Sequence, residues 1–354
     1  MADDAKYEAA ARRAKRVVFA AIALLLCVLF AGALGEAALR LFLPQQESMR
    51  FFASSERYGF ELKKGYHQEY GYPNEGFVMD VRTNSLGLRD REYDPGELSR
   101  SGGLRVLLLG DSFAFGQGVN MQDHYGTKLE AILRGTGLET TVIKGGVPGW
   151  GTLQETRYAE DHFEIFRPDF VVITFCGNDP GDDEGFLYKL SDSQRGILRF
   201  PGKTFLRDHS HLYRFIFYRF KQMFHGAMIR KEAAAAGDSV RIDPQSAHII
   251  TDAEWERSLE AIRAFRDAFT AFNPAGVVAV QATAPWQEDI RARLSGLTNG
   301  KDLFFVDLFN DTISIPREDR RLPYDGHWSP RMHAISARAL GDFILRRSAA
   351  MEKP

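Results

Sequence analysis

From about residue 104 onward, short apolar runs alternate with helical patterns, and this alternation constrains the fold more than any other feature. The runs span residues 105–109, 140–144, 169–175, 277–283 and 303–307. Strand–helix alternation of this kind is typical of a parallel sheet covered by helices on both faces. We therefore expect an α/β domain, a three-layer sandwich around a five-stranded parallel sheet.

Helix signals lie between the runs. Asp123 could cap a helix that ends at Gly135, and Thr251 with Glu254 forms a capping box for a second helix. A final amphipathic helix is expected at about 330–347.

An insertion at about 185–250 interrupts the alternation. Within it, residues 211–228 are rich in aromatic and basic side chains and predict an aromatic helix, and residues 233–237 read as a linker. Three interpretations stay open: a helix packed on the core, a lid over the active site, or a surface that dips into lipid headgroups.

The N-terminus carries an uncharged apolar run from Val17 to Gly35, close to the ~20 residues that a membrane-spanning helix needs. Four basic residues precede it, Arg12, Arg13, Lys15 and Arg16, and Glu36 follows. The positive-inside rule places the N-terminus in the cytoplasm and the rest of the chain outside. We expect residues 1–16 to be cytoplasmic, 17–36 to form a retained anchor, 37–103 a membrane-proximal preamble and 104–348 the catalytic domain. The alternative is a signal peptide cleaved near Ala31-Gly32-Ala33.

Composition excludes several other classes of protein. The net charge of −2, with scattered basic residues, gives no reason to expect nucleic acid as a partner. The two cysteines, Cys27 and Cys176, form no disulfide framework. His209 and His211 lack the accompanying ligands of a zinc site, so no metal and no cofactor is expected.

Four segments that follow predicted strands carry the chemistry. They are Gly110-Asp111-Ser112-Phe113, the glycine-rich stretch 145–152, Gly177-Asn178-Asp179 and Tyr324-Asp325-Gly326-His327-Trp328. Loops at the carboxyl ends of parallel strands meet at one edge of the sheet, where ligands bind. A serine there needs a base to take its proton, and a histidine oriented by a carboxylate is the common solution. The backbone N–H of Ser112, a glycine N–H, with Gly149 the best candidate, and the Asn178 amide could form an oxyanion hole.

These four segments together resemble the SGNH, or GDSL, hydrolase superfamily of serine esterases and acyltransferases. The resemblance covers about 104–347 and implies a flavodoxin-like sheet, with Ser112 as nucleophile, His327 as base and Asp325 as its orienting partner. It also implies an oxyanion hole formed by Ser112, Gly149 and Asn178. Two features depart from the family pattern: Lys144 stands where the second block usually has asparagine, and only Gly326 separates Asp325 from His327. The Asp-x-His-Trp spacing is similar to the branch that contains envelope polysaccharide O-acetyltransferases and acetylesterases.

The leading hypothesis is a serine-dependent acylester hydrolase or O-acyltransferase, anchored by a single span in the bacterial inner membrane with its catalytic domain in the periplasm. Its substrate would be an acylated envelope or extracellular glycan, or another acyl ester, and Trp150 and Trp328 could stack on a sugar ring or could simply pack. The alternative is a non-catalytic scaffold or carbohydrate-binding subunit of a polysaccharide export complex. Intact Ser112, Asn178, Asp325 and His327 favour the enzyme.

Overall fold

The computed structural model describes residues 2–45, 47–72, 77–94, 96, 103–191, 202–220, 223, 250–323 and 325–351. The chain forms two compact units. The helical unit comprises Met1–Ser48, Tyr72–Phe77 and Leu198–Phe224, and the sheet unit comprises Met49–Gly71, Val78–Ile197 and His225–Pro354. The predicted linker at 233–237, most of the 185–250 insertion and Tyr324 lie outside the described residues.

A five-stranded sheet forms the centre of the sheet unit. Its strands are β5 (Leu104–Gly110), β6 (Thr140–Lys144), β7 (Phe170–Phe175), β8 (Val277–Ala282) and β9 (Leu303–Phe305). They are all parallel and lie in the order β6-β5-β7-β8-β9, which is the flavodoxin-like order. The predicted fold class and all five strands are therefore confirmed.

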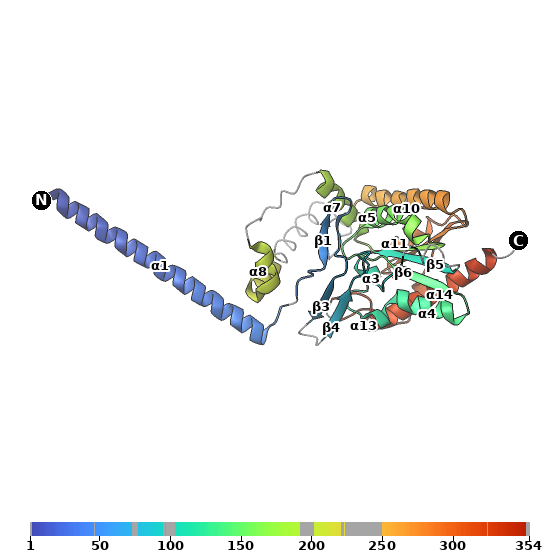
Figure 1. Cartoon of the computed structure of the whole chain (residues 1–354), viewed down its shortest axis with the longest axis horizontal. Helices are drawn as coiled ribbons and strands as arrows, with labels where there is room; N and C mark the ends of the chain where they lie inside the picture. The colour runs from blue at the N-terminus through green and yellow to red at the C-terminus, as the bar shows by residue number, and fades with distance from the viewer. Residues whose placement is uncertain are drawn as a thin grey trace. The chain divides into compact units, whose positions relative to one another are not determined.

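Helices cover both faces of this sheet (Figure 1). α4 (Tyr125–Gly135) and α14 (Pro330–Met351) lie on one side, and α5 (Thr152–Asp161) and α10 (Asp252–Phe272) lie on the other. Shorter helices in the described part of this unit are α3 (Ser112–Phe115), η2 (Met121–Asp123), α6 (Phe163–Phe166), α7 (Asp179–Ser191), α11 (Glu288–Ser295), α12 (Phe309–Thr312) and α13 (Arg317–Arg320).

The hydrophobic core follows from alternation along the strands. Val106 and Leu108 of β5 face α4 and α14 and pack in one buried cluster with Leu129 of α4 and Leu340 of α14. Strand β7 is buried at every position, because helices cover both of its faces.

The predicted helix boundaries are mostly confirmed. The Thr251–Glu254 capping box is present, and α4 ends at Gly135 as expected. The prediction that Asp123 caps α4 is wrong. Asp123 belongs to η2 and pairs with Lys128, while the Nδ1 atom of His124 accepts the cap hydrogen bond from the Gly126 N–H.

The residues between α1 and the parallel sheet form two small two-stranded sheets. β1 (Phe52–Ser55) pairs with β2 (Gly59–Leu62) in a hairpin, and β3 (His67–Tyr72) pairs with β4 (Phe77–Arg82). Residues 49–71 and 78–94 thus belong to the same compact unit as the parallel sheet. The boundary drawn at 103 stays a prediction.

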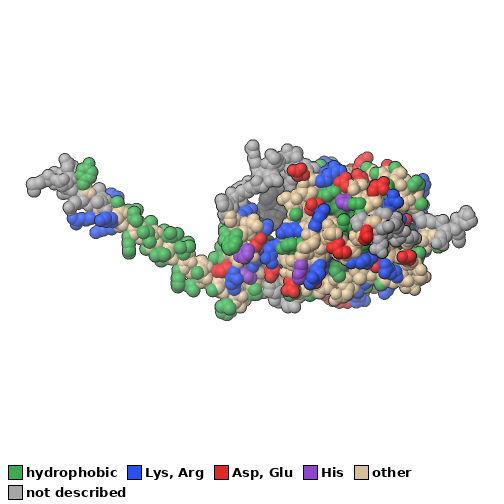
Figure 2. All heavy atoms as spheres, viewed as in Figure 1, with side chains coloured by type: hydrophobic (Ala, Val, Ile, Leu, Met, Phe, Trp, Pro, Cys, Tyr) green, Lys and Arg blue, Asp and Glu red, His purple; other side chains and the backbone are tan. Residues whose placement is uncertain are grey.

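The helical unit is built on one long helix, α1 (Ala2–Phe42). Within the described part of the chain, its segment Arg12–Phe42 is the one helix long and apolar enough to cross a membrane, and no residue of its most apolar stretch is buried. Figure 2 shows basic side chains near its N-terminal end and hydrophobic ones along the rest. α8 (Lys203–His209) and a helical segment at 211–220 also belong to this unit, so the predicted aromatic helix is confirmed for those described residues.

Candidate active site

The loop after β5 presents Ser112 at the start of the short helix α3. Gly110 adopts φ +147°, and a Cβ there would lie 2.7 Å from the Ala114 Cβ, so the sharp turn requires glycine. The Asp111 carboxylate accepts a hydrogen bond from the Phe113 N–H and caps α3. This local structure holds the Ser112 hydroxyl at the carboxyl edge of the sheet.

Ser112 and His327, which are 215 residues apart in the chain, meet in this structure. The distance between Ser112 Oγ and His327 Nε2 is 2.7 Å, a hydrogen bond. The Asp111 carboxylate is a weaker neighbour, 3.5 Å from the same hydroxyl. The histidine nitrogen is therefore the better acceptor for the hydroxyl proton.

Asp325 lies on the other side of the His327 ring. Its Oδ2 atom is 3.1 Å from Nδ1, close enough for an ion pair, yet Nδ1 has no hydrogen-bond partner of acceptable direction. A small rotation of the ring would align the Nδ1–H with the carboxylate, and substrate-free catalytic contacts are often poorly aligned in this way. The shorter Asp-x-His spacing thus brings the carboxylate to the ring, but off the line of the N–H bond.

A compact turn holds these two residues. The backbone of Leu322 donates to the His327 carbonyl at 2.7 Å, and the His327 N–H donates to Asp325 Oδ1 at 3.0 Å. The Arg321 guanidinium donates to the Gly326 carbonyl and lies over the rings of Phe113 and Trp286. Sequence reasoning missed Arg321, since only its position three residues before the predicted block hinted at a role.

The glycine-rich loop after β6 packs tightly on the nucleophile loop. The Val147 N–H donates to the Gly110 carbonyl at 3.0 Å, and a Cβ on Gly146 would come within 2.2 Å of the Ala114 backbone. Gly149 is exposed and adopts φ +80°, a conformation that favours glycine. A Cβ there would lie 3.7 Å from the Phe60 ring, so the β1–β2 hairpin borders this loop.

Asn178 follows β7, the strand next to β5. Its side-chain nitrogen donates to Asp182 Oδ2 at 2.6 Å, and Asp182 lies one helical turn later on α7. The carboxylate therefore fixes the direction of the amide nitrogen. Sequence reasoning missed Asp182, although its spacing of four residues from Asn178 was a usable signal.

Trp150 and Trp328, which could stack on a sugar ring or simply pack, are both buried in the structure. Both rings are 0 % exposed. Trp150 donates through Nε1 to the Phe60 carbonyl, and Trp328 donates to the Thr283 carbonyl. Fully buried indoles with satisfied N–H groups act in packing, which was the alternative interpretation.

Lys144, which stands in place of the family's asparagine, forms a buried ion pair. Its ammonium lies 2.8 Å from Asp90 Oδ1, and both side chains are almost completely buried. The Tyr93 hydroxyl also donates to Asp90. The pair ties the segment before β5 to the end of β6.

Arg89 also joins the segment before β5 to the parallel-sheet domain, by hydrogen bonds near the end of α3. Its guanidinium donates to the carbonyls of Phe115, Gly116 and Val119, at the end of α3, and to the carbonyl of Asp80. Burial lowers its pKa to about 10, so it stays charged at neutral pH.

Buried carboxyls lie beneath the site. Burial raises the pKa of Glu155 well above its usual value, and the neighbouring Asp111 and Asp183 raise it further. Burial also raises the pKa of Asp179. The Cys176 thiol is buried too, and burial raises its pKa well above the usual range, so it stays protonated and is no nucleophile.

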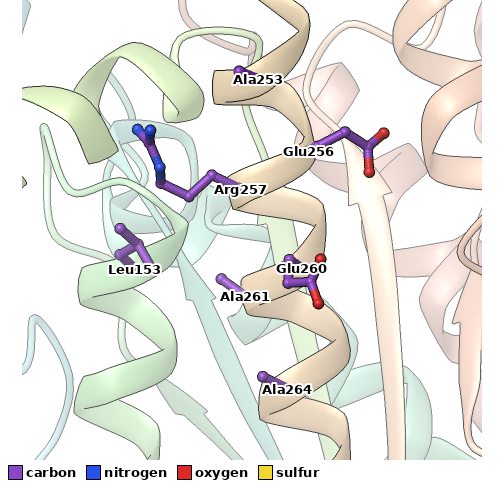
Figure 3. A pocket seen from close by; sticks show the side chains of 7 residues that line it. All are labelled: Leu153, Ala253, Glu256, Arg257, Glu260, Ala261 and Ala264. Atoms are coloured by element: carbon purple, nitrogen blue, oxygen red, sulfur yellow. The ribbon is translucent and has the colours of Figure 1, made fainter.

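The rest of the described surface was searched for metal sites and hollows. In the described residues, no group of three or more His, Cys, Asp or Glu side chains could hold a metal ion. A shallow hollow of about 380 Å³ lies between α5 and α10 (Figure 3). Leu153 and Arg257 line it, and none of its lining residues is a predicted site residue.

The sequence and the structure were compared with protein families, curated proteins and solved structures. The family model of GDSL-like lipases and acylhydrolases matches residues 108–335. No curated protein matches this sequence. Among solved structures, a family 3 carbohydrate esterase of Clostridium thermocellum is 17% identical, with a TM-score of 0.42, and the match covers 70% of this chain and 98% of that one. TesA is 10% identical with a TM-score of 0.42, covering 69% and 99%.

The family match spans more than half of the chain and includes both Ser112 and His327. The chain belongs to the GDSL-like lipase/acylhydrolase family and is an ester hydrolase of that type.

Proposed function

We propose that Ser112 is the nucleophile of an acyl-transfer reaction. The observation that carries this proposal is the 2.7 Å hydrogen bond between Ser112 Oγ and His327 Nε2. His327 takes the hydroxyl proton as Oγ forms a bond to the ester carbonyl carbon, and it then gives that proton to the departing alkoxide. Asp325 stabilises the imidazolium formed in between, since its carboxylate lies 3.1 Å from Nδ1.

The negative charge on the carbonyl oxygen needs preorganised donors. We assign this role to the backbone N–H groups of Ser112 and Gly149 and to the Asn178 side-chain amide. The support is their position on loops that follow β5, β6 and β7, three adjacent strands. Asp182 holds the Asn178 nitrogen, which lowers the cost of aligning it.

The acyl-enzyme is then attacked by water, giving hydrolysis, or by a sugar hydroxyl, giving transfer. His327 accepts the proton of the attacking hydroxyl in either case. Residues Ser112, His327 and Asp325 serve both outcomes equally, because they act on the shared acyl-enzyme.

We further propose that α1 is a retained anchor and that the catalytic unit faces the periplasm, where an acylated envelope glycan is the substrate. The support is the exposed apolar stretch of α1 preceded by basic residues. The helix also continues without interruption through Ala31–Ala33, past the alternative cleavage site. The glycan assignment depends on this location and on the Asp-x-His-Trp resemblance.

Turnover of an activated acetyl ester by the detergent-solubilised full chain tests the chemistry. Ser112→Ala should lose at least ~10³-fold in kcat, while Ser295→Ala, at an exposed serine on α11, should keep wild-type turnover. Wild-type turnover by Ser112→Ala would exclude the serine mechanism.

A reporter fused after Pro354 tests the location separately. We expect activity only from a reporter that works in the periplasm. Release of acetate from acetylated envelope glycan, against none from a deacetylated control, would test the substrate class.

A further inference from the structure

The end of α1 is joined to the insertion by a set of hydrogen bonds centred on Glu36. Its carboxylate accepts from the backbone N–H groups of His211 and Leu212, at 3.0 and 2.8 Å, and from the Ser210 hydroxyl at 2.8 Å. Glu36 therefore caps the helical segment 211–220 from a different part of the chain. A carboxylate at a helix N-terminus also compensates the helix dipole.

Further hydrogen bonds hold the end of α1 and the residues after it to α8 and residues 211–220. The Arg40 guanidinium donates to the His209 carbonyl, and the Gln45 N–H donates to His211 Nδ1 at 2.8 Å. The Ser48 hydroxyl donates to the Arg207 carbonyl at 2.9 Å. α8 and residues 211–220 are thus held at the C-terminal end of α1 by bonds on both sides of their junction.

This joint lies at a defined depth if α1 spans a bilayer. The apolar run from Val17 to Gly35 has roughly 19 residues and is about 28 Å long as a helix, close to the ~30 Å of hydrocarbon in a bilayer. Glu36 directly follows it and marks the edge of the hydrocarbon. Groups bonded to Glu36 then lie at the level of the lipid headgroups.

The two attached helices expose large apolar side chains. Phe205 of α8 is 64% exposed, and Ile216, Phe217 and Met223 are 45%, 40% and 59% exposed. Exposed apolar patches mark binding surfaces, and these side chains lie on two elements that are bonded to the same end of α1.

Basic side chains accompany this apolar face. Arg207 and Arg219 are exposed, and Arg40 is half-exposed at the joint. Exposed aromatic and aliphatic groups beside arginines are typical of elements that lie in a membrane interface, where anionic headgroups attract the cations. Leu41 and Phe42, at the end of α1, are also strongly exposed.

We propose that α8 and residues 211–220 form a membrane-surface contact that inserts Phe205, Ile216 and Phe217 into the headgroup region of the bilayer crossed by α1. This surface rests on the proposed anchor and adds a second, monotopic contact to it. Its occupant is the lipid bilayer, because the hydrogen bonds to Glu36 and Arg40 fix its position at the membrane boundary.

Depth-dependent quenching in the full chain tests this surface. In a Cys27→Ala background, Phe205→Cys and Ile216→Cys each receive an NBD maleimide label, with Lys301→Cys in the sheet unit as the matched exposed control. Cys176 contributes little background, because its buried thiol stays protonated. The protein is placed in vesicles of phosphatidylethanolamine and phosphatidylglycerol that carry a 5-doxyl lipid.

We expect the 5-doxyl lipid to quench the labels at 205 and 216 by about twofold, since interfacial helices bury their apolar faces ~5–10 Å deep. The doxyl lipid should not quench the label at 301, whereas iodide in the water should quench it. Ester turnover by each labelled protein confirms that the fold is intact.

Three outcomes would overturn the proposal in different ways. If the labels at 205 and 216 behave like the label at 301 while the vesicles retain the protein, the surface contact is refuted but the anchor is not. Labels shielded from both iodide and doxyl lipid would show that protein, such as a second copy of the chain, covers this face. Failure of the protein to remain with the vesicles would exclude the anchor itself.

Discussion

Replacing Arg89 with methionine removes the tie between the turn after β4 and the end of the nucleophile helix α3. The arginine donates four hydrogen bonds to backbone carbonyls, with lengths from 2.8 to 3.1 Å. Methionine keeps most of the apolar stem but leaves these carbonyls without their donor. The carbonyls of Phe115 and Gly116 directly follow the turn that carries Ser112.

The expected loss of stability follows from two opposing contributions. Hydrogen bonds from a charged donor stabilise by about 1.5 kcal/mol each at the lower end of their range, roughly 6 kcal/mol for four. Burial of the charge opposes them. Its pKa of about 10, against 12.5, corresponds to about 3 kcal/mol, because one pKa unit equals about 1.4 kcal/mol. We therefore expect Arg89→Met to lower the free energy of unfolding by about 3 kcal/mol.

Urea unfolding followed by tryptophan fluorescence measures this loss, because all four tryptophans lie in the sheet unit. Arg82→Met is the matched control: its ion pair with Asp80 is exposed, so we expect a loss below about 1 kcal/mol. We also expect kcat of the folded Arg89 variant to fall more than its KM rises, because Ser112 is less well held. A stability loss no larger than that of the control, with unchanged kcat, would refute this account of Arg89.

Three further predictions concern the site and its support. Asn178→Ala should lower the chemical rate by ~10²-fold with little change in substrate binding, because an oxyanion donor acts mainly in the transition state; an unchanged single-turnover rate would remove it from the site. Asp325→Asn should lower kcat by less than the ~10⁴-fold seen for well-aligned triads, because its carboxylate lies off the line of the His327 N–H; a ~10⁴-fold loss would show that the two align during catalysis. Burial lowers the pKa of His333 to about 3, so the unfolded chain binds its proton first and stability falls as pH drops below about 6.5. Between pH 7 and 5 the wild type should lose about 2 kcal/mol more than His333→Asn, and parallel unfolding curves would contradict this.

The parallel sheet could be predicted from the sequence because its strands are buried on both faces. Such strands appear in the sequence as short continuous apolar runs. The strand predicted at residues 140–144 is β6, with the same bounds. The strands β1 to β4 gave no comparable signal. They pair in two-stranded sheets with many half-exposed residues, so no clear apolar pattern marks them.

The pairing of Ser112 with His327 could also be anticipated, because loops at the carboxyl ends of parallel strands meet at one edge. The supporting contacts could not. Arg89 binds backbone carbonyls, which any residue supplies, so its partners leave no trace in the sequence. Trp150 is buried through contacts with Tyr58 and the Phe60 carbonyl, some 90 residues away, and nothing local distinguishes it from an exposed ring.

Covalent labelling of the full chain by a fluorophosphonate tests the central claim most directly. The probe phosphonylates a serine only when a neighbouring base removes its proton and donors stabilise the resulting oxyanion. We expect one adduct, on the peptide that carries Ser112, with no labelling of Ser112→Ala and labelling slowed by at least ~10²-fold in His327→Gln. Labelling of another serine, or labelling of Ser112 at the wild-type rate without His327, would contradict the mechanism.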